Sequence, residues 1–315
     1  HTRSLSVSWG SEMCIRDRRE TGKTFVPMVA GVIAVFVNLI FNYILIFGKF
    51  GAPQLGVSGA ALATALSRVV EFLIVVIWTH KNKEINRFII GAYRTLKIPA
   101  SLAGDIIRKG TPLLFNEVLW AAGVAVVNQC FSVRGLTVVA GMNIASTIAN
   151  LFNVIFIALG SAVAIMVGQE LGANDFDKAK DTAGKVIAFS VCCTIVTSIL
   201  MILMGGLFPK LYNTTEEIRQ LATSMIRITA CVMPLQAFLH ATYFTIRSGG
   251  KTIITFFFDS GYSWCVGIPF AYLIIHYTGL PILTIYLLYY LLDIIKATVG
   301  YILLKKGVWL NNIVA

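Results

Sequence analysis

The stretches Arg19-Glu20-Thr21-Gly22-Lys23-Thr24 and Arg247-Ser248-Gly249-Gly250-Lys251-Thr252 share Arg, Gly, Lys and Thr at matching places, 228 residues apart. A second match, at the same offset, pairs Gly51-Ala52-Pro53 with Gly279-Leu280-Pro281. The residues between the lysine and the proline are mostly apolar in both copies. An offset repeat of this kind in a membrane protein usually indicates two fused structural halves with the functional site between them.

The composition is that of a helical membrane protein. Of the 315 residues, 57% are hydrophobic and only 13% are charged, and the mean hydropathy is +0.78. A soluble chain of this length needs far more polar surface. Crossing a bilayer takes about 20 apolar residues per helix. Eight such spans are predicted, at residues 25–47, 59–79, 112–133, 136–167, 186–207, 220–246, 253–276 and 280–304.

The net charge of +11 reflects topology and gives no reason to expect a nucleic-acid partner. Loops with many Lys and Arg residues alternate along the chain with loops that have few. In a membrane protein, the loops with many Lys and Arg residues are cytoplasmic. The C-terminus is therefore expected in the cytoplasm. The rich set is Lys81, Lys83, Arg87, Arg94, Lys97, Arg108, Lys109, Lys178, Lys180, Lys185, Arg247, Lys251, Lys305 and Lys306, against Lys49, Arg134 and Lys210 in the poor loops.

Six spans separate the two copies of the repeated phrase, and an even number keeps the repeat parallel. The repeat unit is therefore six helices, so twelve are expected in a two-lobe protein, with four of them before this chain begins. The expected parts are 1–18, a non-native tail; 19–80, two helices of the first lobe; 81–110, an amphipathic cytoplasmic linker or a plain solvated one; 111–306, a complete second lobe; and 307–315, a cytoplasmic tail.

Three separated motifs resemble those of multidrug and toxic compound extrusion (MATE) transporters. They are Asn38-x-x-x-Asn42 followed by residues 48–64, the run Val167 to Asn174, and the run Arg247 to Thr252. The resemblance implies two six-helix lobes in a V around a central cavity, in a cell membrane. It also implies export of cationic or amphipathic organic compounds in exchange for H⁺ or Na⁺, with no other cofactor. The protein is expected to be a monomer and not an enzyme.

Glu117 is the first candidate for ion coupling. It lies about five residues into its span, beside Asn116, and Trp120, Val124 and Asn128 continue its helix face. Burial favours the protonated form of a carboxyl group, whereas a nearby cation favours the charged form, so such a group can exchange a proton for a cationic compound. The resemblance places a coupling acid on this helix. The alternative is a structural acid bonded to a neighbouring helix.

Asn38 and Asn42 lie one turn apart, and Thr64 is on the next span. Their oxygen atoms suit Na⁺, which is a hard cation, although two asparagines can also simply bridge helices. In the family pattern that the resemblance implies, the second position is Asp. Asn42 cannot titrate, which moves the prediction for proton coupling toward Glu117.

Other intramembrane polar residues are expected either to line a cavity or to join helices. One stripe of polar residues lies along one face of the span 136–167, and a second lies along the span 220–246. Asp293 and Lys296 are three residues apart and predicted to neutralise each other, as are Arg68 and Glu71. The predicted cavity set is Asn116, Asn128, Asn143, Ser146, Asn150, Asn153, Gln236, His240, Tyr243, Asp259 and Tyr262.

The sequence leaves two alternatives to cation-coupled export open. A lipid-linked oligosaccharide flippase of the same superfamily would favour more cationic cavity walls. A membrane-embedded lipid-modifying enzyme would need a nucleophile or metal constellation, and the sequence has none. The two Gly-Lys-Thr triplets lack the first glycine of a phosphate-binding loop. The six cysteines lack metal-binding spacing and are interpreted as small apolar residues.

Overall fold

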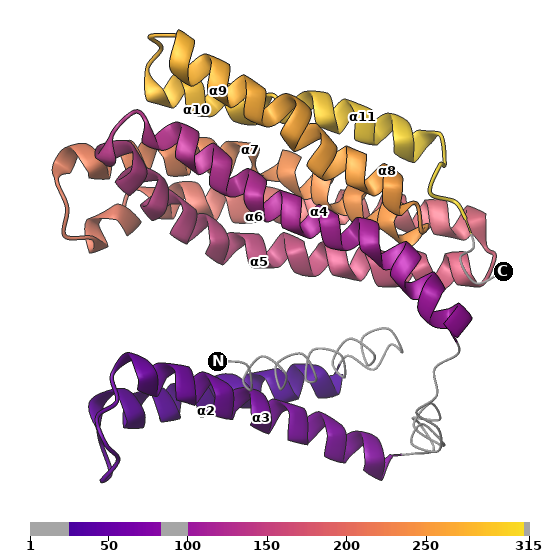
Figure 1. Ribbon diagram of the computed structural model, residues 1–315, viewed down its shortest axis with the longest axis horizontal. Coiled ribbons are helices and arrows are strands. Elements are labelled where there is room, and N and C mark those ends of the chain that lie inside the picture. Colours follow the sequence, from indigo (N-terminus) through magenta and orange to yellow (C-terminus); the bar gives the residue numbers. More distant parts are fainter. Residues whose placement is uncertain (1–24, 83–99, 312–315) are drawn as a thin grey trace. The chain divides into compact units, whose positions relative to one another are not determined.

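The computed structural model describes residues 25–82 and 100–311. The regular elements in these ranges are all helical, and they form two units divided between Ile98 and Pro99 (Figure 1). The all-helical membrane class predicted from composition is confirmed. The predicted tail 1–18, the first copy of the repeated phrase and most of the predicted linker 81–110 lie outside the described residues. Residues 100–110, expected as the end of that linker, belong to a long helix.

The first unit contains two long apolar helices that pack along each other, α2 (Phe25–Phe47) and α3 (Val57–Lys81). The turn between them begins at Gly48, whose φ of +65° favours glycine. Gly59 lets the helices approach closely, because a Cβ atom there would lie 2.6 Å from the carbonyl oxygen of Leu45. The small residues that the sequence places at this turn are therefore required by the hairpin geometry.

The second unit is organised around α7 (Glu216–Ser248), which packs against helices that precede and follow it in the chain. Its length lets one helix contact most of the unit. The other elements are α4 (Ala100–Ser132), α5 (Leu136–Gly172), α6 (Phe176–Gly205), the 3₁₀ turn η2 (Phe208–Leu211), α8 (Thr252–Phe256), the π-helical segments η3 (Phe257–Gly261) and η4 (Ser263–Gly267), α9 (Ile268–Tyr277), α10 (Ile282–Leu291) and α11 (Asp293–Lys305).

Seven helices in the described ranges are long and apolar enough to cross a membrane. They correspond to seven of the eight predicted spans, with α10 and α11 forming one span from Ile282 to Lys305. The eighth predicted span, 253–276, is also helical, but η3 and η4 divide it into shorter α-helical pieces. A π-turn accommodates one extra residue, and such turns are frequent at functional sites. An apolar run in the sequence looks the same whether the helix is regular or contains π-turns, so hydropathy did not predict these segments.

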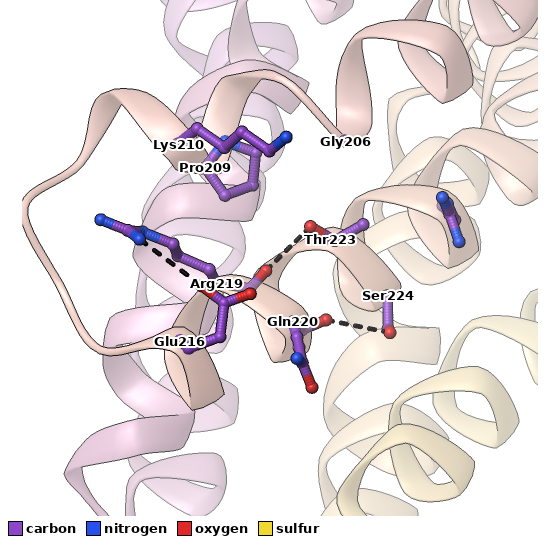
Figure 2. Close-up of a pocket in the computed structure, with 9 residues that line it drawn as sticks. Gly206, Pro209, Lys210, Glu216, Arg219, Gln220, Thr223 and Ser224 are labelled. Carbon is purple, nitrogen blue, oxygen red and sulfur yellow. Dashed lines mark hydrogen bonds and ion pairs between the residues drawn. The ribbon is translucent and has the colours of Figure 1, made fainter.

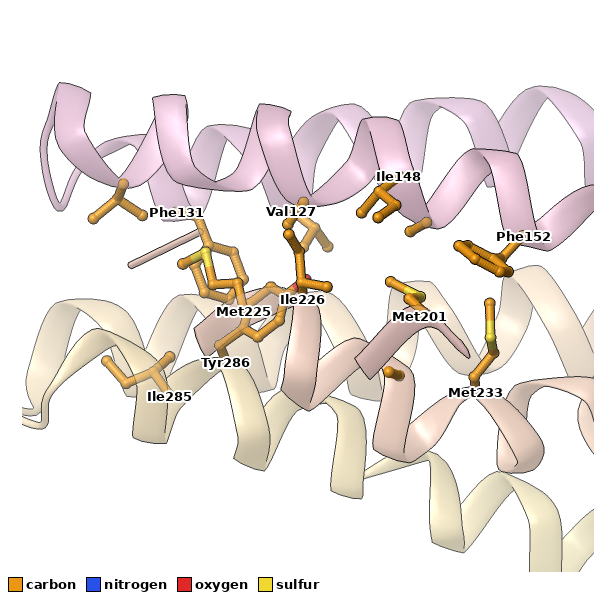
Figure 3. Packing of buried hydrophobic residues seen from close by; sticks show 14 of the residues in the cluster. Val127, Phe131, Ile148, Phe152, Met201, Met225, Ile226, Met233, Ile285 and Tyr286 are labelled. Atoms are coloured by element: carbon orange, nitrogen blue, oxygen red, sulfur yellow. The ribbon is translucent and has the colours of Figure 1, made fainter. Parts of the chain in front are cut away.

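The core of the second unit holds α4, α5, α6, α7 and α10 together. Phe131, Ile148, Met225 and Ile226 are buried there, with the aromatic ring of Tyr286 packed edge-on against Phe131 (Figure 3). A second cluster buries Trp309, which follows α11, against residues of α5 and α6. These two clusters fix the helices whose polar side chains are described next.

Candidate functional site

Asn116 is the centre of a polar network inside the second unit. Its side chain is only 1% exposed, and its amide nitrogen donates to Tyr243 Oη and Asp259 Oδ2, each at 3.2 Å. The hydroxyl of Ser260 donates to Asn116 Oδ1 at 2.7 Å. A buried amide with all these partners is satisfied, so the network links α4, α7 and η3 without an unpaired polar group at its centre. Three residues predicted for the cavity, Asn116, Tyr243 and Asp259, are thus brought together.

Asp259 also forms an ion pair with Lys296 of α11. Lys296 Nζ lies 2.9 Å from Asp259 Oδ1, and the two side chains are only 15% and 21% exposed. The ammonium group lies 5.3 Å from the centre of the Phe258 ring and 5.9 Å from that of Tyr262, distances typical of cation–π contacts. The carboxylate and the two rings therefore form a cage around a cation that the protein itself supplies.

The predicted pairing of Asp293 with Lys296 is wrong, since Lys296 instead pairs with Asp259. Gln236 Nε2 donates to Asp293 Oδ2 at 2.6 Å. Asp293 is the first residue of α11, where the helix restarts after Leu292, and the Leu292 carbonyl accepts a hydrogen bond from Tyr262 Oη at 2.7 Å. Gln236 of α7 thus provides the hydrogen-bond partner of Asp293. Lys296 pairs instead with Asp259 of the π-helical segment η3.

The equivalent pair in the first unit is confirmed: Arg68 Nη1 lies 2.7 Å from Glu71 Oε2. Glu71 is buried, so its short contact with Arg68 neutralises a carboxylate that water does not reach. This pair is intrahelical, at a spacing of three residues, and the helix geometry alone brings its members together.

Glu117 points to a different environment from that of its neighbour Asn116. Its side chain is 61% exposed, and its nearest charge is the Arg247 guanidinium, 3.6 Å away. Arg247 also donates to Tyr243 Oη at 3.5 Å. Trp120 and Asn128 are exposed on the same helix, as the predicted face requires. Glu117 is thus loosely held at the edge of the network, while Asp259 is firmly held inside it.

The stripe on α5 does not join this network within the described chain. Asn143, Ser146 and Asn150 are exposed, and Asn153 is half-buried. The hydroxyl of Ser146 donates to the Asn143 backbone carbonyl at 3.0 Å. His240 lies on α7 between Gln236 and Tyr243, with its ring 5.0 Å from that of Phe156 and its Nδ1 buried without a partner in the described residues.

In the first unit, the predicted cation ligands lie together. Asn42 Nδ2 donates to Asn38 Oδ1 at 2.8 Å, and Asn38 Nδ2 donates to Thr64 Oγ1 at 3.3 Å. The Oδ1 atom of Asn42 is buried and lacks a hydrogen-bond partner in the described ranges. An amide oxygen left in this state can accept a hard cation. The adjacency agrees with the spacing in the sequence, and the ligand role remains a prediction.

Some residues of the network were not predicted from the sequence. Ser260 was missed because a single serine in an apolar span carries no periodic signal. Trp264 Nε1 donates to the Leu119 carbonyl at 2.9 Å and fixes η4 against α4, which only the fold reveals. Among residues 25–82 and 100–311, no group of three His, Cys, Asp or Glu side chains is placed to hold a metal ion.

The sequence is similar to that of a known protein family and of a bacterial protein. Residues 112–273 match the MatE family model. The chain is 27% identical over 271 residues to the probable multidrug resistance protein YoeA of Bacillus subtilis (strain 168), covering 86% of the chain and 58% of YoeA.

Solved structures are similar in fold. One is an outward-facing conformation of a multidrug resistance MATE family transporter (TM-score 0.79, 20% identity, 90% of this chain and 62% of that one). Another is a MOP superfamily transporter from Pyrococcus furiosus (TM-score 0.77, 20% identity, 90% and 62%). The chain thus spans about three fifths of the length of these relatives. Because the family model covers more than half of the chain, the protein belongs to the MatE family.

Proposed function

We propose that the whole protein exports small organic cations or amphipathic compounds across the cell membrane, in exchange for H⁺ or Na⁺, by alternating access. The family assignment supports a transporter, and the Bacillus subtilis relative is named as a probable multidrug resistance protein. Related folds have been solved in outward-facing and inward-facing conformations. We further propose two six-helix lobes, a monomer and a cytoplasmic C-terminus.

The observation that carries the coupling proposal is the contrast between Glu117 and two other intramembrane acids that form ion pairs, Asp259 and Glu71. Asp259 and Glu71 are held by ion pairs of 2.9 and 2.7 Å, whereas the contact of Glu117 with Arg247 is 3.6 Å long. A coupling acid must exchange partners during each cycle, and a carboxylate in a weak, exposed pair loses little when it does so. Glu117 meets this requirement better than the other two.

In the proposed cycle, a proton binds Glu117 on the outer side and favours release of the cationic substrate there. Deprotonation toward the cytoplasm restores the carboxylate, and a new cationic substrate binds. Proton and substrate compete because protonation removes the charge that attracts the cation. Arg247 would hold the unprotonated carboxylate when no substrate is bound.

The charge of the site favours cationic substrates. Within the second unit, the carboxylates of Glu117, Asp259 and Asp293 face the cations of Arg247 and Lys296. Each cation is already paired with a carboxylate, and Asp293 is bonded to a neutral amide. An anionic substrate, such as the pyrophosphate of a lipid-linked oligosaccharide, would meet a net negative site. This arrangement supports organic-cation export over the flippase alternative.

The test is efflux of a fluorescent organic cation from cells that express the full-length protein with Glu117→Gln. We expect the pH-gradient-driven rate to fall by at least about tenfold, a change typical of losing a proton-transfer group. The matched control is Gln129→Ala, an exposed polar change on the same helix that lies outside the predicted cavity set. Unchanged efflux in a well-expressed Glu117→Gln variant would remove Glu117 from the coupling mechanism.

Sodium coupling has its own test, which involves a different unit. Purified protein would be heated in NaCl and in KCl of equal concentration. If Asn38, Asn42 and Thr64 bind Na⁺, the unfolding temperature rises in NaCl only, since a ligand that binds the folded state stabilises it. Asn42→Ala removes the unpartnered oxygen and should abolish the difference. Equal unfolding temperatures in both salts would argue against a sodium site there.

A further inference from the structure

A pocket of about 470 Å³ lies at one end of α7, outside the Asn116 network. Its wall is built from the end of α6, the turn η2 and the first turns of α7 (Figure 2). Gly206 and Pro209 form one side, where the chain turns between the two helices. Three basic side chains, Lys210, Arg219 and Arg227, line it with a single carboxylate, that of Glu216. The pocket is therefore strongly cationic.

Two of the three cations have no charged partner in the described chain. Arg219 is neutralised, because Nη1 lies 3.5 Å from Glu216 Oε2 and Nη2 donates to the Tyr212 carbonyl at 3.2 Å. The side chains of Lys210 and Arg227 form no ion pair or hydrogen bond with any other described residue. The pocket thus presents two uncompensated positive charges, and an anion is the ligand that complements them.

The position of Arg227 along α7 adds to this argument. It lies eleven residues after Glu216, the first residue of this membrane-spanning helix, or about 16 Å along the axis at 1.5 Å per residue. Because α7 has 33 residues, it is longer than the hydrocarbon core of a bilayer, about 30 Å, and its first turns can extend into the headgroup region. An arginine inside a membrane span is costly unless its long side chain reaches polar surroundings. Here Arg227 lines the pocket together with the polar side chains of Gln220, Thr223 and Ser224, which are more favourable surroundings for its charge than hydrocarbon.

The end of α6 and the turn η2, which contribute residues to the pocket, also carry exposed leucines. Leu203 of α6, Leu207 and Leu211 are 68%, 66% and 80% exposed. In a bilayer, such side chains contact acyl chains, while the basic groups lie at the level of the headgroups. A ligand with an anionic head and an apolar tail would satisfy both surfaces at once.

We propose that this pocket binds the headgroup phosphate of an anionic membrane phospholipid, with Lys210 and Arg227 as its cationic contacts. The lipid would neutralise Arg227 and pack its chains along the exposed leucines. Because the pocket shares no residue with the Glu117 and Asn116 sites, this inference is independent of the proposed transport mechanism.

The test is a direct binding measurement on the purified chain in a neutral detergent. Dioctanoyl phosphatidylglycerol would be titrated and its retention followed by native mass spectrometry, with dioctanoyl phosphatidylcholine and inorganic phosphate as comparisons. We expect phosphatidylglycerol to bind, and Lys210→Gln or Arg227→Gln to weaken binding by at least about tenfold each, as expected for loss of a charge-assisted contact. Arg227→Lys, which keeps the charge, should retain most of the affinity.

Lys180→Gln is the matched control, since it removes one positive charge from an exposed pair with Asp177 elsewhere in the same unit. It should leave lipid binding unchanged. Lys210 lies in a short exposed turn, so Lys210→Gln keeps the test informative if Arg227→Gln does not fold. Equal binding of phosphatidylcholine, equal competition by inorganic phosphate, or unchanged affinity in Lys210→Gln would each overturn the proposal.

Discussion

Lys296 pairs with Asp259 at 2.9 Å across two helices, although Asp293 precedes it by only three residues on α11. The choice depends on the π-helical segment η3, which presents Asp259 and Ser260 to neighbouring helices. Asn116 Oδ1 accepts a hydrogen bond from the Ser260 hydroxyl, and Asn116 Nδ2 donates one to the Asp259 carboxylate. One carboxylate therefore joins α4, η3 and α11.

Removing the lysine should destabilise the second unit strongly. Lys296→Met leaves Asp259 partly buried with no cation, and breaking a buried pair in this way typically costs about 3 kcal/mol. The double variant Lys296→Met with Asp259→Asn should recover much of that loss. Thermal unfolding in detergent, followed by tryptophan fluorescence, measures both. The control Lys180→Met breaks an exposed pair and should change stability by less than about 0.5 kcal/mol. A single variant as stable as the parent would contradict the structural role of the pair.

Asn116 should be far less tolerant than Asn128 on the same helix. Asn116→Leu removes three side-chain hydrogen bonds at once, those with Asp259 Oδ2, Tyr243 Oη and Ser260 Oγ. Asp259 Oδ2 loses its hydrogen-bond donor, whereas Ser260 keeps the backbone carbonyl of residue 116 and Tyr243 keeps Arg247. Each buried polar group left unsatisfied costs about 1–3 kcal/mol. Asn128 is exposed, so Asn128→Leu should be near neutral. The fraction of protein that stays monodisperse on heating distinguishes the two, and similar losses for both would show that Asn116 is not the centre of the network.

Gly249, in the second copy of the repeated phrase, should tolerate no side chain. A Cβ atom there would lie 1.9 Å from the carbonyl oxygen of Trp309, so Gly249→Ala would push the buried C-terminal segment away. We expect a loss of about 2 kcal/mol or more, as for overpacked sites. Gly168→Ala, in open space on α5, should be neutral or slightly stabilising because alanine favours helix. Limited proteolysis near the C-terminus reports the displacement; a protected terminus in Gly249→Ala would refute it.

Arg134 should act as a cap for α9. Its Nη2 atom donates to the carbonyl oxygens of Ile275 at 2.6 Å and Thr278 at 2.5 Å, which closes the C-terminal end of that helix. Arg134→Met should cost about 2 kcal/mol, because charged donors to carbonyl groups contribute more than neutral ones. Lysine cannot place two donors with the same fixed geometry, so Arg134→Lys should recover only part of the stability. Hydrogen exchange at residues 275–278 is the measurement, and unchanged protection in Arg134→Met would exclude the cap.

The sequence by itself determined the features that depend on one helix at a time. Apolar runs located the membrane spans, since a span must satisfy its backbone internally and face lipid. Fixed helical spacing placed Arg68 beside Glu71 and Asn38 beside Asn42, and it put Glu117, Trp120 and Asn128 on one exposed face. These contacts are local, and 3.6 residues per turn is enough to predict them.

The tertiary structure decided every contact that crosses from one helix to another. Asp259 could have been a lone cavity acid, and Lys296 could have paired with Asp293; packing of α11 against α7 and the pitch change at η3 selected the observed partners. The same packing buries Asn116 and leaves Glu117 exposed, although they are adjacent in sequence. Periodicity gives the face of a helix, but which neighbour that face meets depends on the rotation and offset of packed helices, which only the folded protein fixes.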